Sequence, residues 1–381
     1  MKAFLQFLQR AFKYFRNTKR VWRRPPRASL LIIDRGTASP LDEMFAHHNS
    51  HIMEIRGESV NMLALFRALP KIHLGAVAYL EAYIDFVKPK LILSRTDNNH
   101  TLWQLKRRPN VTYQVALVQN GWRLNLEFEM PELLNLAGHC GGWEIDKLFA
   151  FGSAWASQIP GHVRFRAELN GSSKANNFLF SRRSERNGVG FISSYRSTVG
   201  KGKNYLDVSV HYQYLDSKIS DSGKDLIIVA NTKKSESEWA ELTYYSESFA
   251  KSKWTLSSRD SLSSSYQQLQ NVECVIVESS SLGYECLGMG MRVGFIAFRP
   301  QHRQDRRFGK PLEFGEKGPF WTNDPSEEEI GRILDYLLNV SDEQWERDSG
   351  WIRDQLMVHD YGNTKIRAYV EGVLTDSLES K

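Results

Sequence analysis

The residues best suited to chemistry lie in one stretch, from Glu273 to Phe298. An apolar run that predicts a buried strand ends at Ser279, Ser280 and Ser281, and the residues after it predict a helix. A helix N-terminus offers unpaired backbone N–H groups and a partial positive charge, so hydroxyls there predict an anion site. Glu285 lies four residues after Ser281, on the same helix face, where it could accept hydrogen bonds from two ribose hydroxyls. The alternative is that the serines only cap the helix and the carboxylate favours its first turn.

Two aspartates are candidates for a general base, because each follows a run that predicts a strand. Asp34 ends the run Ser29–Asp34, and Asp97 comes shortly after the run Leu91–Ser94. Asn98 and Asn99 follow Asp97, and such a triplet also favours an Asx turn or a helix cap. Catalysis and turn formation therefore both stay open for Asp97.

Other reactive clusters carry weaker signals. His47, His48 and His51 lie close together, but no clear further ligand accompanies them, so no metal site is predicted. His139 and Cys140 have no readable partner that would make a nucleophile. The sequence contains neither an Asp-x-Asp triplet nor a phosphate-binding P-loop motif, and we expect no cofactor.

Positive charge is concentrated at the N-terminus. The 381 residues include 50 Lys and Arg against 44 Asp and Glu, a net charge of +6. Nine of these basic residues and no acidic ones lie within residues 1–27, so the rest of the chain is slightly negative. A nucleic-acid-binding protein would carry its basic face across the fold, and we expect no nucleic acid partner.

Residues 1–27 predict a basic amphipathic helix that ends at two prolines. Its apolar residues share one face: Phe4, Leu8, Phe12 and Phe15. Such a helix suits an anionic membrane surface, while packing on the protein body or on a partner is the alternative. No apolar stretch is long enough to span a bilayer, and three cysteines in no metal or disulfide pattern favour a reducing compartment. We therefore expect a cytoplasmic protein on the inner face of the cytoplasmic membrane.

Strand-like runs separated by helix-length segments predict an α/β protein with two Rossmann-like domains facing a cleft. The polar segment 169–186 is the best linker, and the serine-rich run 255–265 predicts a loop. Ligands of such sheets bind at the carboxyl ends of the strands. The predicted organisation is a basic amphipathic helix in 1–27, an N-terminal Rossmann-like domain in 28–168, a linker in 169–186, a C-terminal Rossmann-like domain in 187–325 and C-terminal helices in 326–381 that pack back on the domains.

Several short motifs follow one another along the chain: Asp97-Asn98-Asn99, Gln119-Asn120-Gly121, Phe149–Gly152, Ser279–Glu285, Arg307-Phe308-Gly309 and Gly315–Trp321. In this order and spacing they resemble bacterial surface-carbohydrate (lipopolysaccharide) biosynthesis proteins of the GT-B glycosyltransferase type. The resemblance covers roughly residues 90–325 and implies a donor site in the second domain and an acceptor site in the first. It also implies leaving-group stabilisation without an obligatory metal.

In related enzymes a Ser-Ser pair and a His-Pro pair hold the nucleotide. Ser279 and Ser280 fit the first pair, but the second is absent, and Asn231 and Lys233 stand near its place. Ser193 and Ser194 complete the donor residues that we expect. In the acceptor domain, Asn98, Asn99 and Asn120 are expected in loops beside the cleft.

The sequence thus predicts a glycosyltransferase that moves a sugar from a nucleotide sugar to a lipid-linked or growing glycan acceptor, in surface polysaccharide or lipopolysaccharide synthesis. Asp97 and Asp34 are the expected catalytic residues. The alternatives are a nucleotide-sugar epimerase of the same fold, phosphoglycerol-type polymer transfer, and a non-catalytic scaffold that binds glycan or membrane.

Overall fold

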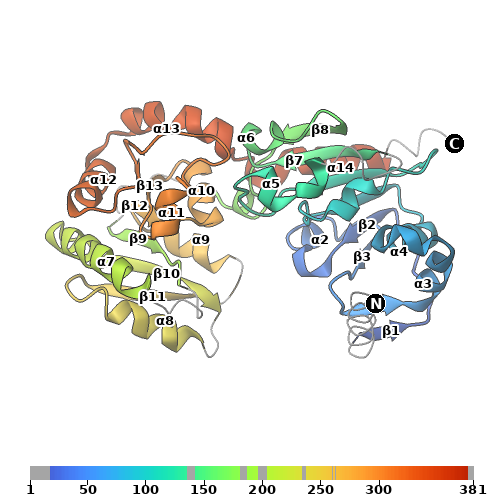
Figure 1. Cartoon of the computed structure of the whole chain (residues 1–381), viewed down its shortest axis with the longest axis horizontal. Helices are drawn as coiled ribbons and strands as arrows, with labels where there is room; N and C mark the ends of the chain where they lie inside the picture. Colours follow the sequence, from blue (N-terminus) through green and yellow to red (C-terminus); the bar gives the residue numbers. More distant parts are fainter. Residues whose placement is uncertain are drawn as a thin grey trace.

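The chain forms two α/β lobes that lie side by side (Figure 1). The computed structural model describes residues 18–134, 142–180, 187–195, 204–233, 237–259, 261 and 263–375. Each lobe is built on one mainly parallel sheet, which confirms the predicted α/β class with two Rossmann-like domains.

The first lobe contains a six-stranded sheet, entirely parallel, in the order β3-β2-β5-β6-β7-β8. Alternate residues of β2 enter two different apolar clusters, which shows that both faces of this sheet are covered. Its strands are β2 (Leu30–Ile33), β3 (Ser50–Met53), β5 (Leu91–Ser94), β6 (Gln114–Val118), β7 (Trp143–Ala150) and β8 (Val163–Leu169). Its helices are α2 (Leu41–Met44), α3 (Met62–Ala68), α4 (Ala76–Val87), α5 (Leu126–Glu129) and α6 (Ser153–Ala156).

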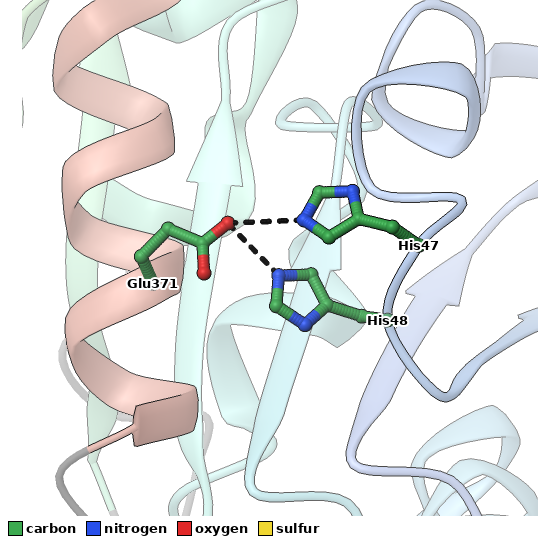
Figure 2. Close-up of side chains that lie close together, drawn as sticks. All are labelled: His47, His48 and Glu371. Atoms are coloured by element: carbon green, nitrogen blue, oxygen red, sulfur yellow. Dashed lines mark hydrogen bonds and ion pairs between the residues drawn. The ribbon is translucent and has the colours of Figure 1, made fainter.

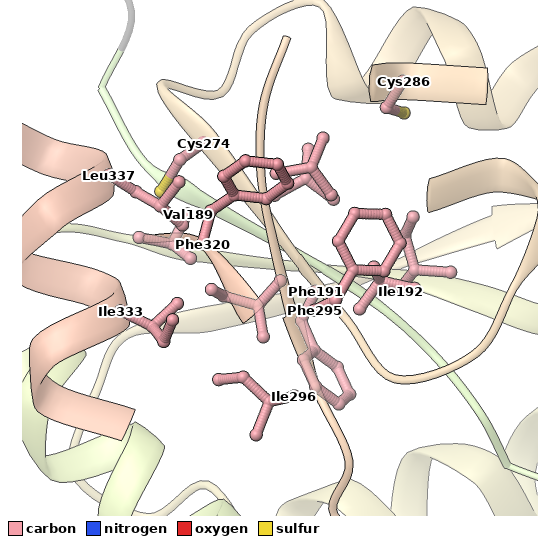
Figure 3. Close-up of a cluster of buried hydrophobic side chains, with 14 of the residues drawn as sticks. Val189, Phe191, Ile192, Cys274, Cys286, Phe295, Ile296, Phe320, Ile333 and Leu337 are labelled. Carbon is pink, nitrogen blue, oxygen red and sulfur yellow. The ribbon is translucent and has the colours of Figure 1, made fainter. Parts of the chain in front are cut away.

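The second lobe contains a seven-stranded sheet in the order β11-β10-β9-β12-β13-β15-β14, parallel except for β14. Its strands are β9 (Val189–Ile192), β10 (Leu226–Lys233), β11 (Trp254–Arg259), β12 (Cys274–Val277), β13 (Arg292–Ile296), β14 (Lys317–Gly318) and β15 (Trp321–Thr322). Its helices are α7 (Asn204–Asp221), α8 (Ser237–Ser246), α9 (Ser264–Leu269), α10 (Ser281–Gly288), α11 (Pro300–Gln304), α12 (Glu327–Asn339) and α13 (Asp342–Leu356). Phe191, Phe295 and Phe320 fill its core with aliphatic side chains from the sheet and α12 (Figure 3).

The chain passes between the lobes twice. It leaves the first lobe after β8, and it returns after α13 to end in α14 (Thr364–Thr375), which packs on the first sheet through Ile366 and Val370. The two crossings lie against each other, because Gly171 pairs with His359. Gly171 has a φ of +73°, and a Cβ there would lie 1.9 Å from the Val358 carbonyl oxygen. Only glycine fits this close approach of two backbones.

The N-terminal region differs in part from the predicted helix. Residues 1–17 lie outside the described residues, so the amphipathic face is not tested. Lys19–Val21 form a strand, β1, parallel to β4 (Ser59–Asn61), and not a helix. The Asn61 side chain also donates to the Arg23 carbonyl oxygen at 2.8 Å. The reason for the difference is that β4 offers this segment backbone hydrogen bonds, which helical periodicity cannot reveal.

None of the helices within the described residues combines the length and the apolar composition that crossing a bilayer requires.

Candidate functional site

A pocket lies at the carboxyl ends of β9, β10 and β12, where the second lobe meets the first. Most of its lining belongs to the second lobe, whereas Asn120 comes from the first lobe and Lys174 from the crossing between them. Six residues that the sequence singled out line it: Ser193, Asn231, Ser280, Ser281, Glu285 and Asn120. Residues far apart in the sequence therefore meet around one cavity.

The N-terminus of α10 faces this pocket. Ser280 is the N-cap residue, and its Oγ accepts a hydrogen bond from the Leu282 backbone N–H at 3.3 Å. Ser281 Oγ accepts from the Trp122 backbone N–H of the first lobe at 2.8 Å, whereas Ser279 is exposed and does not line the pocket. A Cβ at Gly283 would lie 2.6 Å from a Val277 methyl group, so glycine lets α10 pack directly on β12.

Glu285 is buried and connects three separate segments. Its Oε1 accepts a hydrogen bond from Ser172 Oγ at 2.6 Å, and its Oε2 accepts one from the Tyr266 hydroxyl at 2.7 Å. Burial raises the pKa of Glu285, and these two hydrogen bonds offset only part of the rise. The hydroxyl partners that the sequence assigned to a ribose are thus supplied here by the protein, while the carboxylate still lines the pocket.

An aromatic stack joins the lobes beside the pocket. The rings of Trp122 and Tyr284 lie 3.6 Å apart between centroids, at an interplanar angle of 3°. The Tyr284 hydroxyl accepts from the Gly309 backbone N–H at 3.1 Å, so the Arg-Phe-Gly motif positions the ring. Sequence reasoning did not identify Trp122, although it directly follows the Gln119-Asn120-Gly121 motif.

A buried carboxylate that sequence reasoning missed, Glu241 of α8, organises the loops after β9 and β10. It accepts hydrogen bonds from the Ser193 hydroxyl and from the Asn231 backbone N–H, the latter at 3.0 Å. The Asn231 side chain donates to the Tyr195 carbonyl oxygen at 2.8 Å. The contacts of Glu241 therefore hold Ser193 and Asn231 at the pocket wall. The backbone of Lys233 ends β10, but its side chain lies outside the described part of the molecule.

Ser194 does not line the pocket and belongs to a neighbouring polar cluster. Its Oγ accepts from Arg299 Nη2 at 3.0 Å, and Arg299 pairs with Glu278 at the end of β12 at 3.3 Å. His302 Nδ1 lies 2.9 Å from the same carboxylate. Burial by itself would raise the pKa of Glu278, but the contacts with His302 and Arg299 lower it below its usual value. This cluster connects the residues that follow β9, β12 and β13, and no sequence motif predicted it.

Asp97 fixes the loop of the first lobe that reaches the pocket. It is 1% exposed, and its Oδ1 accepts from the Asn120 backbone N–H at 3.0 Å and from Arg123 Nη2 at 2.7 Å. Asn99 caps the following 3-10 helix by accepting from the Thr101 backbone N–H at 3.0 Å, whereas Asn98 is exposed. The structural role foreseen for this triplet is thus filled by Asn99, while Asp97 holds Asn120 in place.

Asp34 is farther from the pocket and is held by an ion pair. Arg56 donates from Nη2 to its Oδ2 at 2.6 Å, and Thr96 donates to the same oxygen at 2.6 Å. Burial would raise the pKa of Asp34, but the bonds from Arg56 and Thr96 outweigh it and lower the pKa. A lowered pKa makes a carboxylate a weaker base. Its φ of +80° adds local strain that this network supports.

Comparison with known proteins adds the family. Residues 116–373 match the model of a family described as "putative O-antigen biosynthesis protein". No curated protein sequence matches the chain.

Solved structures share its fold. The wall teichoic acid polymerase TagF, in a structure with CDPG, is 10% identical with a TM-score of 0.53, over 93% of this chain and 90% of that one. A Staphylococcus aureus MnaA–UDP structure is 12% identical with a TM-score of 0.52, over 94% and 97%. A Neisseria meningitidis UDP-GlcNAc 2-epimerase bound to UDP-GlcNAc is 12% identical with a TM-score of 0.51, over 91% and 99%. The chain therefore belongs to this O-antigen biosynthesis family and has the two-domain, GT-B-like fold of these enzymes.

Proposed function

We propose that this protein is a GT-B glycosyltransferase that moves a sugar from a nucleotide sugar to a lipid-linked or growing glycan acceptor in surface polysaccharide synthesis. One observation carries the proposal: the N-terminus of α10, Ser280 and the carboxylate of Glu285 line a pocket that the first lobe completes with Asn120. A transferase needs a donor site of this kind opposite a second lobe that presents the acceptor.

The second lobe supplies the donor site. The backbone N–H groups of α10 and the Ser280 hydroxyl bind the donor phosphates, and Lys174 adds a positive charge beside them. Glu285 contacts the nucleoside. The fold relatives support a nucleotide ligand, because their structures contain UDP, UDP-GlcNAc or CDPG. As the sugar departs, negative charge grows on the phosphate, where the same groups stabilise it.

The first lobe supplies the base that accepts the proton of the acceptor hydroxyl. Of the two aspartates, Asp97 is better placed, because it bonds to Asn120, which lines the pocket. Neither aspartate lines the pocket itself, and each pairs with an arginine, Asp97 with Arg123 and Asp34 with Arg56. Asp34 bonds to Arg56 and Thr96 and not to a residue that lines the pocket, and these bonds lower its pKa. We therefore assign the base to Asp97 and a positioning role to Asp34.

The reaction class is tested with the full chain and a panel of UDP, CMP, CDP, GDP, ADP and dTDP sugars. A selective rise in melting temperature identifies the donor, since a ligand at about 100 times its dissociation constant adds about 2.7 kcal/mol. Chromatography then follows nucleotide release with and without a lipid-linked glycan acceptor. Release that depends on the acceptor, with a matching mass gain of the acceptor, supports a transferase.

Two other outcomes would overturn the proposal. Conversion of the donor sugar without an acceptor would show an epimerase. No turnover of any donor sugar would favour a non-catalytic scaffold.

The variant Asp97→Asn should lose transfer but keep donor binding, because asparagine retains the oxygen that accepts from the Asn120 backbone N–H and loses only the charge that takes up the proton of the acceptor. Asn98→Ala, an exposed neighbour, is the matched control and should transfer normally.

The same proposal places the protein on the inner face of the cytoplasmic membrane. Residues 1–17 lie outside the described residues, but Trp22 follows them and is 59% exposed. The centroid of its ring lies 6.1 Å from that of Phe66, which is 51% exposed. Arg24 and Arg67 both lie over the Phe86 ring, 5.3 Å from its centroid. Exposed aromatics beside arginines suit an anionic bilayer surface. Co-sedimentation with anionic vesicles, but not zwitterionic ones, is expected, and Trp22→Ser should weaken it.

A further inference from the structure

A second cluster of reactive side chains lies on the first lobe, and none of its members lines the pocket. His47 and His48 follow α2, and Glu371 lies on α14, more than 300 residues later. Both imidazoles point at one carboxylate oxygen (Figure 2): Glu371 Oε1 is 2.9 Å from His48 Nε2 and 3.3 Å from His47 Nε2. Three potential ligand atoms thus converge from two separate elements.

We propose that His47, His48 and Glu371 bind a divalent transition-metal ion of the zinc type. The three ligand atoms lie within 4.8 Å of one another. In a tetrahedral zinc site with bonds of about 2.0–2.2 Å, neighbouring ligand atoms are about 3.3–3.5 Å apart. The two distances to the carboxylate oxygen are already close to that spacing, so small side-chain movements suffice to admit the ion.

The donor set decides the class of metal. Two imidazole nitrogens and one carboxylate oxygen suit zinc and its first-row neighbours, whereas magnesium and calcium prefer oxygen ligands throughout. His47 and Glu371 are 60% and 44% exposed in their side chains. The ion can therefore enter from solvent and keep a water molecule as its fourth ligand.

The position of Glu371 gives the metal a structural consequence. Its neighbours on α14, Val370 and Leu374, pack into the apolar cluster of the first sheet. This helix follows the second crossing between the lobes. A metal ion at this site would therefore link α14 to the segment after α2 in the first lobe. An ion that binds only the folded chain stabilises it in proportion to its concentration.

The test uses the full chain, freed of metal with a chelator and without nucleotide. Zinc titration by calorimetry gives stoichiometry and affinity, and cobalt absorption in the visible range reports a tetrahedral site. The wild-type chain is expected to bind one ion and to melt at a higher temperature with zinc. The double variant His47→Ala/His48→Ala should bind at least about tenfold more weakly and lose the zinc-dependent rise.

Two variants sharpen the result. Glu371→Gln keeps the size of the side chain but removes its charge and should also weaken binding. His51→Ala is the matched control, because His51 bonds to the Tyr83 hydroxyl instead, at 2.8 Å, and it should bind zinc normally. Undiminished zinc binding in the double variant, or no stoichiometric binding to the wild-type chain at about 100 µM zinc, would overturn the proposal. The double variant should still bind nucleotide as the wild type does, so a loss of zinc binding is distinguishable from a failure of the proposed donor pocket.

Discussion

Glu285→Gln is expected to weaken nucleotide binding and to leave the fold nearly unchanged, whereas Glu285→Ala should damage both. The distinction arises because the carboxylate has two tasks in the proposed enzyme. It accepts hydrogen bonds from the hydroxyls of Ser172 and Tyr266, which ties the crossing segment and α9 to α10. It also lines the pocket in which we place the nucleotide.

The structure sets the size of each effect. Alanine leaves both buried hydroxyls without their acceptor, at about 1–3 kcal/mol each, so the free energy of unfolding should fall by about 2–6 kcal/mol. Glutamine retains one acceptor oxygen, and its side-chain N–H can donate to a hydroxyl oxygen. The free energy of unfolding of Glu285→Gln should therefore fall by about 1 kcal/mol or less. A nucleoside that uses the charged carboxylate would lose about 1.5–3 kcal/mol of binding, or about 10–150-fold in Kd.

Urea unfolding measures the first quantity, and calorimetry with the nucleotide chosen by thermal shift measures the second. Glu127→Gln, an exposed carboxylate on α5, serves as the matched control and should alter neither. Nucleotide affinity equal to wild type in Glu285→Gln would reduce Glu285 to a structural tie. Stability equal to wild type in Glu285→Ala would refute the hydrogen-bond reasoning itself.

Three further predictions concern stability and lobe contact. Gly171→Ala should lower the free energy of unfolding by about 2–4 kcal/mol in urea titration, because a backbone oxygen blocks its Cβ, while Gly161→Ala, with open space, should not. The pKa of Glu329 is lowered to about 2, so its stabilisation is present above pH 4.5 and lost as pH falls towards 2. At neutral pH the free energy of unfolding of the wild type should exceed that of Glu329→Gln by about 1–2 kcal/mol, a value kept small because solvent screens the exposed Lys317 and Arg332. Unfolding measured at decreasing pH should show this difference disappear. Trp122→Ala should enlarge the radius of gyration in X-ray scattering, whereas the exposed Trp239→Ala should not.

Most elements in the sheet centres were predictable, whereas β8 and β11 at the sheet edges were not. Buried runs such as Leu91–Ser94 and Cys274–Val277 are apolar throughout because both faces of their sheets are covered. Sequence reasoning missed β8 and placed a serine-rich loop over most of β11. Each is an edge strand with one neighbour, and in β8 only Val163 is buried, while the other residues are exposed or partly buried. An edge strand needs less apolar surface, so its sequence carries a weaker signal.

Side-chain partners were the least predictable part of the site. The motif Ser279–Glu285 indicated the helix N-terminus, because a strand followed by hydroxyls and a helix is a local pattern. The hydrogen-bond partners of these residues lie far away in the sequence: Ser172 is 113 residues from Glu285, and Trp122 is 159 residues from Ser281. No periodicity links such residues. Glu241 was missed for the same reason, since its carboxylate meets Ser193 only after β9 and α8 have packed.

The residues assigned to the donor also join the two lobes. Ser281 accepts from the Trp122 backbone, and Glu285 accepts from Ser172 in the segment between the lobes. A nucleotide that engages either residue must therefore act on the contact between the lobes as well as on the pocket. Glycosyl transfer requires water to be kept from the departing sugar while the acceptor approaches from the other lobe. A donor site built from interface residues couples these two events, because occupancy of the site and the arrangement of the lobes then depend on the same hydrogen bonds.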